Sequence, residues 1–290
     1  MVNKKNDKYN AVWVSHSSMG DFIKCPRAYY LHNVYKSPDT GRKIGIVNQF
    51  LSLGSAVHEV LENLAKYKAE DRFKEPLIIA LEKAWQNVSG KKGGFVDNSE
   101  EEEIKKRALE MIQRVEKNPG PLIEKTIKIK ESEGGMPPNF LLSKEENIIL
   151  CGKIDWLVYK PQDDSVHILD FKTGKNDERE GSLQLPIYQL LLKNLQKRKV
   201  SGASYWYIDR DDKPKDVELP DIDESFENVY SIAKKIKEMR ELSKIEGAEN
   251  VFLCPNGENG CSTCKPYLKI IRGEAECVGV NNTGQDLFIV

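Results

Sequence analysis

Asp170 and Lys172 stand two residues apart in HILDFKTGK (167–175), directly after an apolar run. Alternate residues of a β-strand point to the same face of its sheet, so this carboxylate and this ammonium would share one face. Such a pair could help to hold a divalent cation and to orient a water molecule for attack on a phosphate. It could equally be an ordinary ion pair on an edge strand. The elements around the pair decide between these interpretations.

A hairpin would bring a second carboxylate to this pair. The β-rich sequences CGKIDWLVYK and SVHILDFKT flank PQDD, whose residues favour a turn. A hairpin centred on this turn puts Asp155 directly opposite Asp170, with Cβ atoms about 4.5–5.5 Å apart. Two like charges so close destabilise a hairpin unless a positive charge lies between them. Lys172 alone could supply that charge, and so could Mg²⁺ or Mn²⁺, which prefer carboxylate oxygens.

The elements that must position these residues follow an order typical of a mixed α/β (α+β) fold. Helical periodicity dominates 14–120, a strand-rich segment with one embedded helix covers 122–210, and a helix with a cysteine module covers 223–277. We expect a single domain over 1–290, with a central mixed sheet flanked by helices. Helices are predicted over 15–35, 50–68, 75–88, 99–120, 183–196 and 223–242, and strands over 126–132, 146–160, 166–173 and 201–209.

Composition excludes some classes of function. The chain has 290 residues and a formal net charge of −1, which argues against a histone-like binder but not against a local basic groove. The basic segments 193–199 and 234–240 could follow a phosphate backbone or be solvated helix faces. No apolar run approaches the roughly 18 residues of a membrane span, and no apolar core of a signal peptide is present. A cytoplasmic location without membrane contact is therefore expected.

The cysteines suggest a metal site rather than disulfides, which are rare in a reducing compartment. The C-x-x-C pair of Cys261 and Cys264 has metal-ligand spacing, and Cys254 precedes it. Cys25, far upstream, and Cys277 are the candidates for the remaining ligand. Thiolates in this number would accept Zn²⁺ or an iron–sulfur cluster.

Four motifs in order resemble the RecB-like branch of the PD-(D/E)XK nuclease superfamily. Asp155 in GKID and the D-x-K of DFK match its catalytic strands, QLPIY (184–188) matches its Q-x-x-x-Y element, and GSAVHEVLE (54–62) resembles its G-x-x-x-H helix. Each motif alone is weak, but the ordered set is specific. The resemblance implies a central sheet of the restriction-endonuclease type.

The resemblance also implies roles for individual residues. It implies that His58, Asp155 and Asp170, with the Phe171 carbonyl, bind Mg²⁺ or Mn²⁺, that Lys172 acts in catalysis with Asp155 and Asp170, and that Gln184 and Tyr188 position DNA or brace the site. Glu59 and Glu62 are expected to lie outside the site.

RecB-like nucleases often join one cysteine of a CPRAYYL-type helix to three near the C-terminus around a [4Fe–4S] cluster. KCPRAYYLH resembles that first element, which implies a quartet of Cys25, Cys254, Cys261 and Cys264. The tail departs from the usual pattern, in which C-x-x-C is followed five residues later by the last cysteine. Because of that departure, either Cys254 or Cys277 could be the remaining ligand, and the bound metal could be Zn²⁺ instead of an iron–sulfur cluster.

The expected function is a metal-dependent DNA nuclease, an exonuclease on single strands or ends. Repair or recombination with a helicase partner and CRISPR adaptation with its proteins are the pathways considered. No P-loop sequence is present, so helicase activity on this chain is not expected. The alternatives are a catalytically silent, nuclease-like DNA-binding clamp and a metal-stabilised interaction module.

Overall fold

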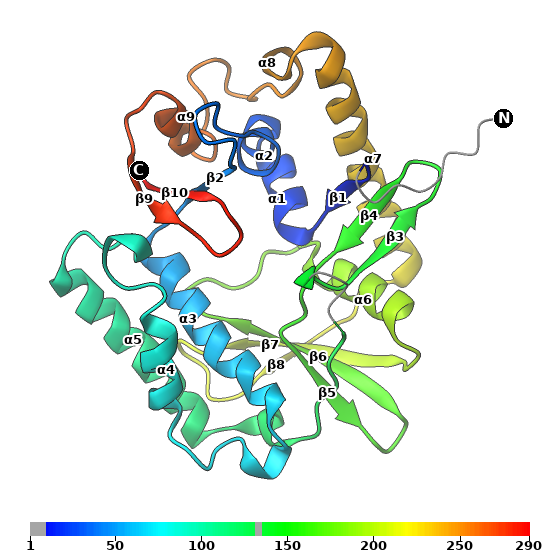
Figure 1. Cartoon of the computed structure of the whole chain (residues 1–290). Helices are drawn as coiled ribbons and strands as arrows, with labels where there is room; N and C mark the ends of the chain where they lie inside the picture. Colours follow the sequence, from blue (N-terminus) through cyan, green and yellow to red (C-terminus); the bar gives the residue numbers. More distant parts are fainter. Residues whose placement is uncertain (1–9, 131–134) are drawn as a thin grey trace.

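The computed structural model describes residues 10–130 and 135–290 (Figure 1). Its central element is a four-stranded sheet in the order β5-β6-β7-β8. β6 is antiparallel to β5 and parallel to β7, and β8 is antiparallel to β7. The strands are β5 (Trp156–Lys160), β6 (Ser165–Lys172), β7 (Val200–Tyr207) and β8 (Lys215–Val217). The fold is therefore mixed α/β, as the sequence predicts.

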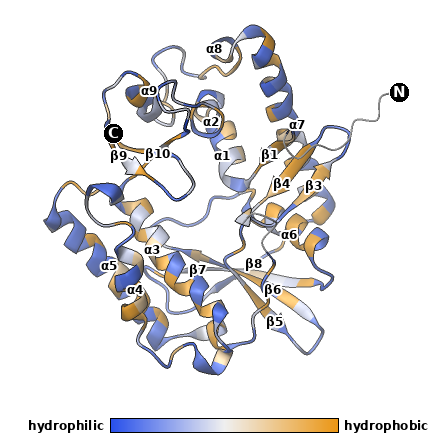
Figure 2. Ribbon diagram, viewed as in Figure 1, coloured by the Kyte–Doolittle hydropathy of each residue, from blue (hydrophilic) through white to orange (hydrophobic). Residues whose placement is uncertain are grey.

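Helices cover both faces of this sheet. One face packs on α6 (Gln184–Leu195), the crossover helix between the parallel strands β6 and β7. The other face packs on α3 (Gln49–Asn63), α4 (Leu77–Trp85) and α5 (Asn98–Lys117). Residues of β6 alternate between these two cores: Ile168 faces α6, whereas Leu169 and Phe171 face α3. Figure 2 shows the hydrophobic residues gathered where the helices meet the strands.

A second, three-stranded sheet has the order β1-β4-β3 and lies beside α6 and α7. β1 pairs with β4 in parallel, and β3 is antiparallel to β4. These elements are β1 (Val12–Val14), α1 (His16–Lys24), β3 (Asn139–Ser143), β4 (Ile148–Cys151) and α7 (Ile222–Glu246).

The last part of the chain closes onto the first. β10 pairs in parallel with β2 and antiparallel with β9, so a strand near residue 45 lies beside the C-terminus (Figure 1). The ring of Phe252 stacks on Tyr30 of α2 at a centroid distance of 5.2 Å. The elements of this region are α2 (Pro26–Asn33), β2 (Ile44–Ile46), α8 (Ala248–Val251), α9 (Lys265–Ile271), β9 (Glu276–Val280) and β10 (Asp286–Ile289).

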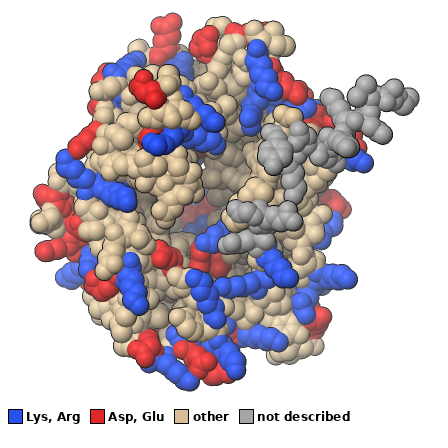
Figure 3. All heavy atoms as spheres, in the orientation of Figure 1, with Lys and Arg blue, Asp and Glu red and all other residues tan. Residues whose placement is uncertain are grey.

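A hollow lies in the middle of the face shown in Figure 3, with acidic and basic side chains together at its lower edge. The region around α1, α2, β9 and β10 lies above it, and α3 and the four-stranded sheet lie below it (Figures 1 and 3). Among residues 10–130 and 135–290, no helix has the length and apolar character needed to span a bilayer.

Some predicted elements differ in the structure. The helix predicted over 15–35, which Pro26 is expected to kink or divide, is two helices separated at Cys25, because Pro26 begins α2 and cannot continue α1. The strand expected over 146–160 is two strands in different sheets. In the segment 126–132, Thr126 forms an isolated bridge with Val158, and residues 131 and 132 lie outside the described part. The predicted strands do not include β1, β2, β3, β8, β9 or β10. The division of the domain into three segments stays a prediction.

Candidate active site and cysteine cluster

The hairpin of β5 and β6 has the predicted register. Trp156 pairs with Leu169, and the pairing continues to the turn. Asp155 precedes the first paired residue, at the open end of the hairpin, where its Oδ2 accepts a hydrogen bond of 3.0 Å from the Phe171 N–H. The peptide of β6 therefore holds the Asp155 carboxylate near Asp170.

Asp170 is almost completely enclosed, with 1% of its surface exposed. Its Oδ1 accepts hydrogen bonds from the Gln184 amide at 2.8 Å and from the Tyr188 hydroxyl at 3.2 Å. Gln184 and Tyr188 are i and i+4 on α6, so both project from the helix face that covers the strand. Asp170 Oδ2 faces the Lys172 ammonium, whose Nζ lies 2.9 Å away.

Lys172 is the centre of a polar cluster on the α6 face of the sheet. Its Nζ lies 2.9 Å from Asp170 Oδ2 and 2.6 Å from Glu178 Oε2, and it donates to Gln184 Oε1 at 2.5 Å. Burial alone would lower the pKa of Lys172, but the two carboxylates outweigh burial and raise it. Lys172 is therefore an ammonium at neutral pH, suited to orienting water and phosphate oxygens rather than to removing a proton.

His58 and Glu62 approach Asp155 from the other side of the sheet. His58 Nδ1 lies 3.4 Å from Asp155 Oδ2 and 3.8 Å from Glu62 Oε1. Helix α3 comes close to the end of β6 because Gly54 has no side chain: a Cβ there would lie 3.2 Å from Thr173 Oγ1. The glycine of the G-x-x-x-H pattern thus has a packing function, one turn before the histidine.

The ionisable side chains of this site shift one another's pKa values. Burial, helped by the charge of Asp155, raises the pKa of Asp170 to about 7 even though Lys172 opposes the shift. Burial lowers the pKa of His58, but hydrogen bonds and charges from Asp155 and Glu62 outweigh it and raise the pKa to about 10. A cation that binds here would therefore displace protons from His58 and Asp170.

The donor set fits a divalent cation. Ligand atoms of His58, Glu62 and Asp155 all lie within 4.8 Å of one another. Asp170, which is not one of these three mutually close residues, adds a buried carboxylate whose Oδ2 lies 2.9 Å from Lys172 Nζ. Imidazole and carboxylates suit Mn²⁺, and the carboxylates alone suit Mg²⁺. His58, Glu62, Asp155 and Asp170 are the residues that would hold it.

The structure brings most of the predicted residues together. Asp170, Lys172, Gln184 and Tyr188 form one group connected by hydrogen bonds and an ion pair. Asp155 lies beside His58 and is held next to this group by the Phe171 N–H. The Phe171 carbonyl as a ligand stays a prediction.

Three polar residues that lie in this site were not predicted from the sequence to be part of it. Glu62, expected outside the site, lies beside His58, and its i+4 spacing from that histidine is a signal that could have found it. Glu178 comes from the loop after β6, and Lys153 forms an ion pair with Glu62. No spacing rule in the sequence indicates Glu178.

The predicted cysteine quartet is also brought together. The sulfurs of Cys25, Cys254, Cys261 and Cys264 lie within 4.8 Å of one another, whereas Cys277 lies exposed on β9. Although burial raises its pKa, backbone hydrogen bonds from Cys264 and Thr263 lower the pKa of the Cys261 thiol to about 6. Burial raises the pKa of the Cys25 thiol to about 12 and also raises that of Cys264, so a metal that binds here would displace protons from these two thiols.

A buried aspartate beside a lysine, with a second aspartate at the end of the same hairpin, is an arrangement that suits phosphodiester hydrolysis. The chain belongs to the PD-(D/E)XK nuclease superfamily, because the model of that family matches residues 13–267. A search of curated proteins finds no match to the chain.

Proposed function

We propose that the protein is a Mg²⁺- or Mn²⁺-dependent deoxyribonuclease that hydrolyses phosphodiester bonds in single strands or at ends. The observation that carries this proposal is the ion pair of Asp170 and Lys172 on β6, with Asp155 held by the N–H of the intervening Phe171 and with His58 and Glu62 beside Asp155. A protein that only binds DNA has no need of a buried carboxylate pair, whose repulsion destabilises the fold.

A bound cation would neutralise charge on the phosphate and make water more acidic. The residues of the chain supply the rest. Lys172 holds its ammonium 2.9 Å from Asp170, where it orients the attacking water and stabilises negative charge on the phosphate. Gln184 contacts Lys172 and Asp170 at once, and Tyr188 fixes the same Asp170 oxygen. These two side chains thus preserve the geometry of the pair.

The preference for single strands or ends is supported by the site's position. The carboxylates lie at the end of the β5–β6 hairpin, where the Asp155 side chain is 10% exposed and the Asp170 side chain 2%. A site partly enclosed by the fold admits a flexible strand more easily than a stiff duplex. We assign an exonuclease role in repair, recombination or CRISPR adaptation, with a helicase or an adaptation protein as partner, on the family resemblance.

Cleavage of DNA labelled at either end tests this proposal. Single-stranded and double-stranded oligonucleotides, with the RNA strand of the same sequence as comparison, are incubated with Mn²⁺ or Mg²⁺. Stepwise shortening of single-stranded DNA is expected, and EDTA should abolish it while the far-ultraviolet circular dichroism stays unchanged. Internal cuts alone would refute the exonuclease assignment, and DNA binding without any cut would favour the clamp.

For the cysteine cluster, we assign a structural metal that ties α2 to the C-terminal region. Arg27 adds to this tie by donating to the carbonyls of Gly257 and Glu258 at 3.2 and 3.1 Å. The family resemblance favours a [4Fe–4S] cluster. The Cys261–Cys264 sulfur distance of 3.9 Å favours Zn²⁺, since tetrahedral Zn–S bonds of about 2.3 Å put sulfurs about 3.8 Å apart. Iron, sulfide and zinc analysis of protein purified without oxygen decides between them.

A further inference from the structure

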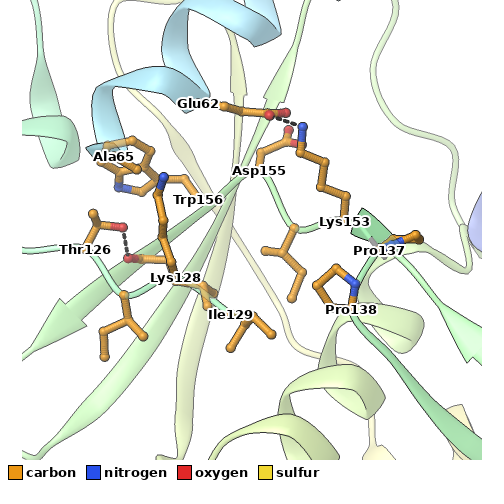
Figure 4. Close-up of a pocket in the computed structure, with 14 residues that line it drawn as sticks. Glu62, Ala65, Thr126, Lys128, Ile129, Pro137, Pro138, Lys153, Asp155 and Trp156 are labelled. Carbon is orange, nitrogen blue, oxygen red and sulfur yellow. Dashed lines mark hydrogen bonds and ion pairs between the residues drawn. The ribbon is translucent and has the colours of Figure 1, made fainter. Parts of the chain in front are cut away.

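A cavity of about 270 Å³ opens beside the candidate metal ligands. Glu62 and Asp155 form part of its wall, so its contents would lie next to the reacting phosphate. Figure 4 shows these two residues at one end, Ile129 and Pro138 at the other, and Lys128 and Lys153 on opposite sides. The volume lies just below the range of about 300–1,000 Å³ typical of small-ligand sites. It therefore suits one nucleobase with part of its sugar.

The lining combines the two kinds of group that a nucleotide needs. Most of the wall is apolar, which suits the faces of an unstacked base. Lys128 and Lys153 are both exposed, and among residues 10–130 and 135–290 Lys128 has no ion-pair partner. Their ammonium groups suit the phosphates on either side of that base. The apolar lining includes Ala65, Ile129, Pro138 and Trp156.

We infer that this cavity binds the nucleobase next to the phosphodiester that is cut. A base within a duplex is stacked and paired, and it would have to leave the helix to enter the cavity. A base in a single strand or at a frayed end enters without breaking a pair. The cavity thus gives a structural reason for a preference for single strands, and this inference rests on the proposed nuclease function.

The test removes one base at a time from a single-stranded oligonucleotide. Strands with an abasic site at successive positions are cut with Mn²⁺, and the cutting rate at one fixed phosphodiester is measured. An abasic site at one adjacent position should slow that cut by about tenfold to a hundredfold, the usual effect of losing one bound base. A rate that does not depend on the position of the abasic site overturns the inference.

Ala65→Leu fills the cavity without changing a candidate ligand. Its matched control is Ala80→Leu, since Ala80 on α4 packs against the same hydrophobic core but does not line the cavity. Ala65→Leu should cut the intact strand about as slowly as wild type cuts the critical abasic strand, and should no longer respond to abasic sites. Ala80→Leu should behave as wild type. An Ala65→Leu profile equal to that of wild type overturns the inference.

A binding measurement separates this inference from the proposed function. In Asp170→Asn protein, 2-aminopurine at the critical position should gain fluorescence on binding because it leaves its stacked neighbours, and Ala65→Leu in the same protein should abolish the gain. A gain without any cleavage by wild type would overturn the nuclease proposal and support the cavity. If wild type cleaves normally but the fluorescence does not rise, the base-binding role of the cavity is overturned and the nuclease proposal stands. If there is no fluorescence rise and no cleavage, both proposals are overturned. The Mn²⁺-induced rise in melting temperature should persist in Ala65→Leu, which shows that its metal site is intact.

Discussion

Asp170→Asn should make the metal-free protein more stable at pH 8 while removing its activity. The Asp170 carboxylate is buried, lies near Asp155 and has a pKa of about 7, against an ordinary value of 3.8. Between these two pH values the folded protein binds a proton that the unfolded chain has lost, so stability falls as pH rises. Above pH 7 the whole destabilisation is present, and below pH 4 it is absent. An asparagine side chain carries no charge, so it does not cause this destabilisation at any pH.

The structure sets the size of this effect. At about 1.4 kcal/mol per pKa unit, ionised Asp170 destabilises the fold by at most about 4 kcal/mol at pH 8. The side-chain oxygen of asparagine can still accept from Gln184 and Tyr188, but its amide group would face the Lys172 ammonium, which offsets part of the gain. A net stabilisation of about 1–3 kcal/mol is expected, or about 2–6 °C in melting temperature.

Urea unfolding in EDTA at pH 5, 6, 7 and 8 measures the effect. Glu178→Gln is the matched control, because Glu178 pairs with the same Lys172 but has the opposite shift. Burial raises the pKa of Glu178, and the hydrogen bond and charge of Lys172 outweigh burial and lower it, so its carboxylate stabilises the fold above pH 4.5. Glu178→Gln should lose stability at pH 8. If Asp170→Asn were also less stable at pH 8, or equally changed at every pH, the reasoning would be refuted.

Three further predictions concern the two metal sites. Because a cation must displace the proton of His58, whose pKa is about 10, Mn²⁺ affinity by calorimetry should rise about tenfold per pH unit from pH 7 to 9, and a flat profile would contradict this. Gln184→Met removes the amide between Lys172 and Asp170 and should lower kcat about tenfold to a hundredfold with unchanged circular dichroism; full activity would count against the bracing role. Cys261→Ser should lower the metal content of the cysteine cluster and the melting temperature, whereas Cys277→Ser should change neither, and equal effects would exclude the assigned quartet.

The local part of the site could be predicted because short-range rules determine it. The turn sequence fixes the hairpin register, and i,i+4 spacing puts Gln184 and Tyr188 on one helix face. The break between β4 and β5 could not be predicted, because both strands are equally β-rich. Its cause is long-range: a Cβ on Gly152 would lie 2.9 Å from Leu191 of α6, so the chain passes close to that helix where it leaves one sheet for the other.

The positions of residues that depend on loops or on the pairing of distant strands could not be predicted from the sequence. Glu178 reaches Lys172 only because the loop after β6 turns back, held by a 2.9 Å hydrogen bond from its own N–H to the Tyr207 hydroxyl. The choice between Cys254 and Cys277 depends on β9 pairing with β10, which leaves Cys277 exposed. Neither fact has a local pattern behind it.

The most direct test of the central claim is Mn²⁺-dependent cleavage of single-stranded DNA by wild type, Asp170→Ala and Asp164→Ala. Asp164 is exposed in the turn of the same hairpin and lies far along it from the carboxylate pair, so it controls for general effects of removing an acid from that hairpin. Wild type and Asp164→Ala should cut at equal rates, and Asp170→Ala should not cut. Cleavage by Asp170→Ala at the wild-type rate would place the chemistry elsewhere in the chain.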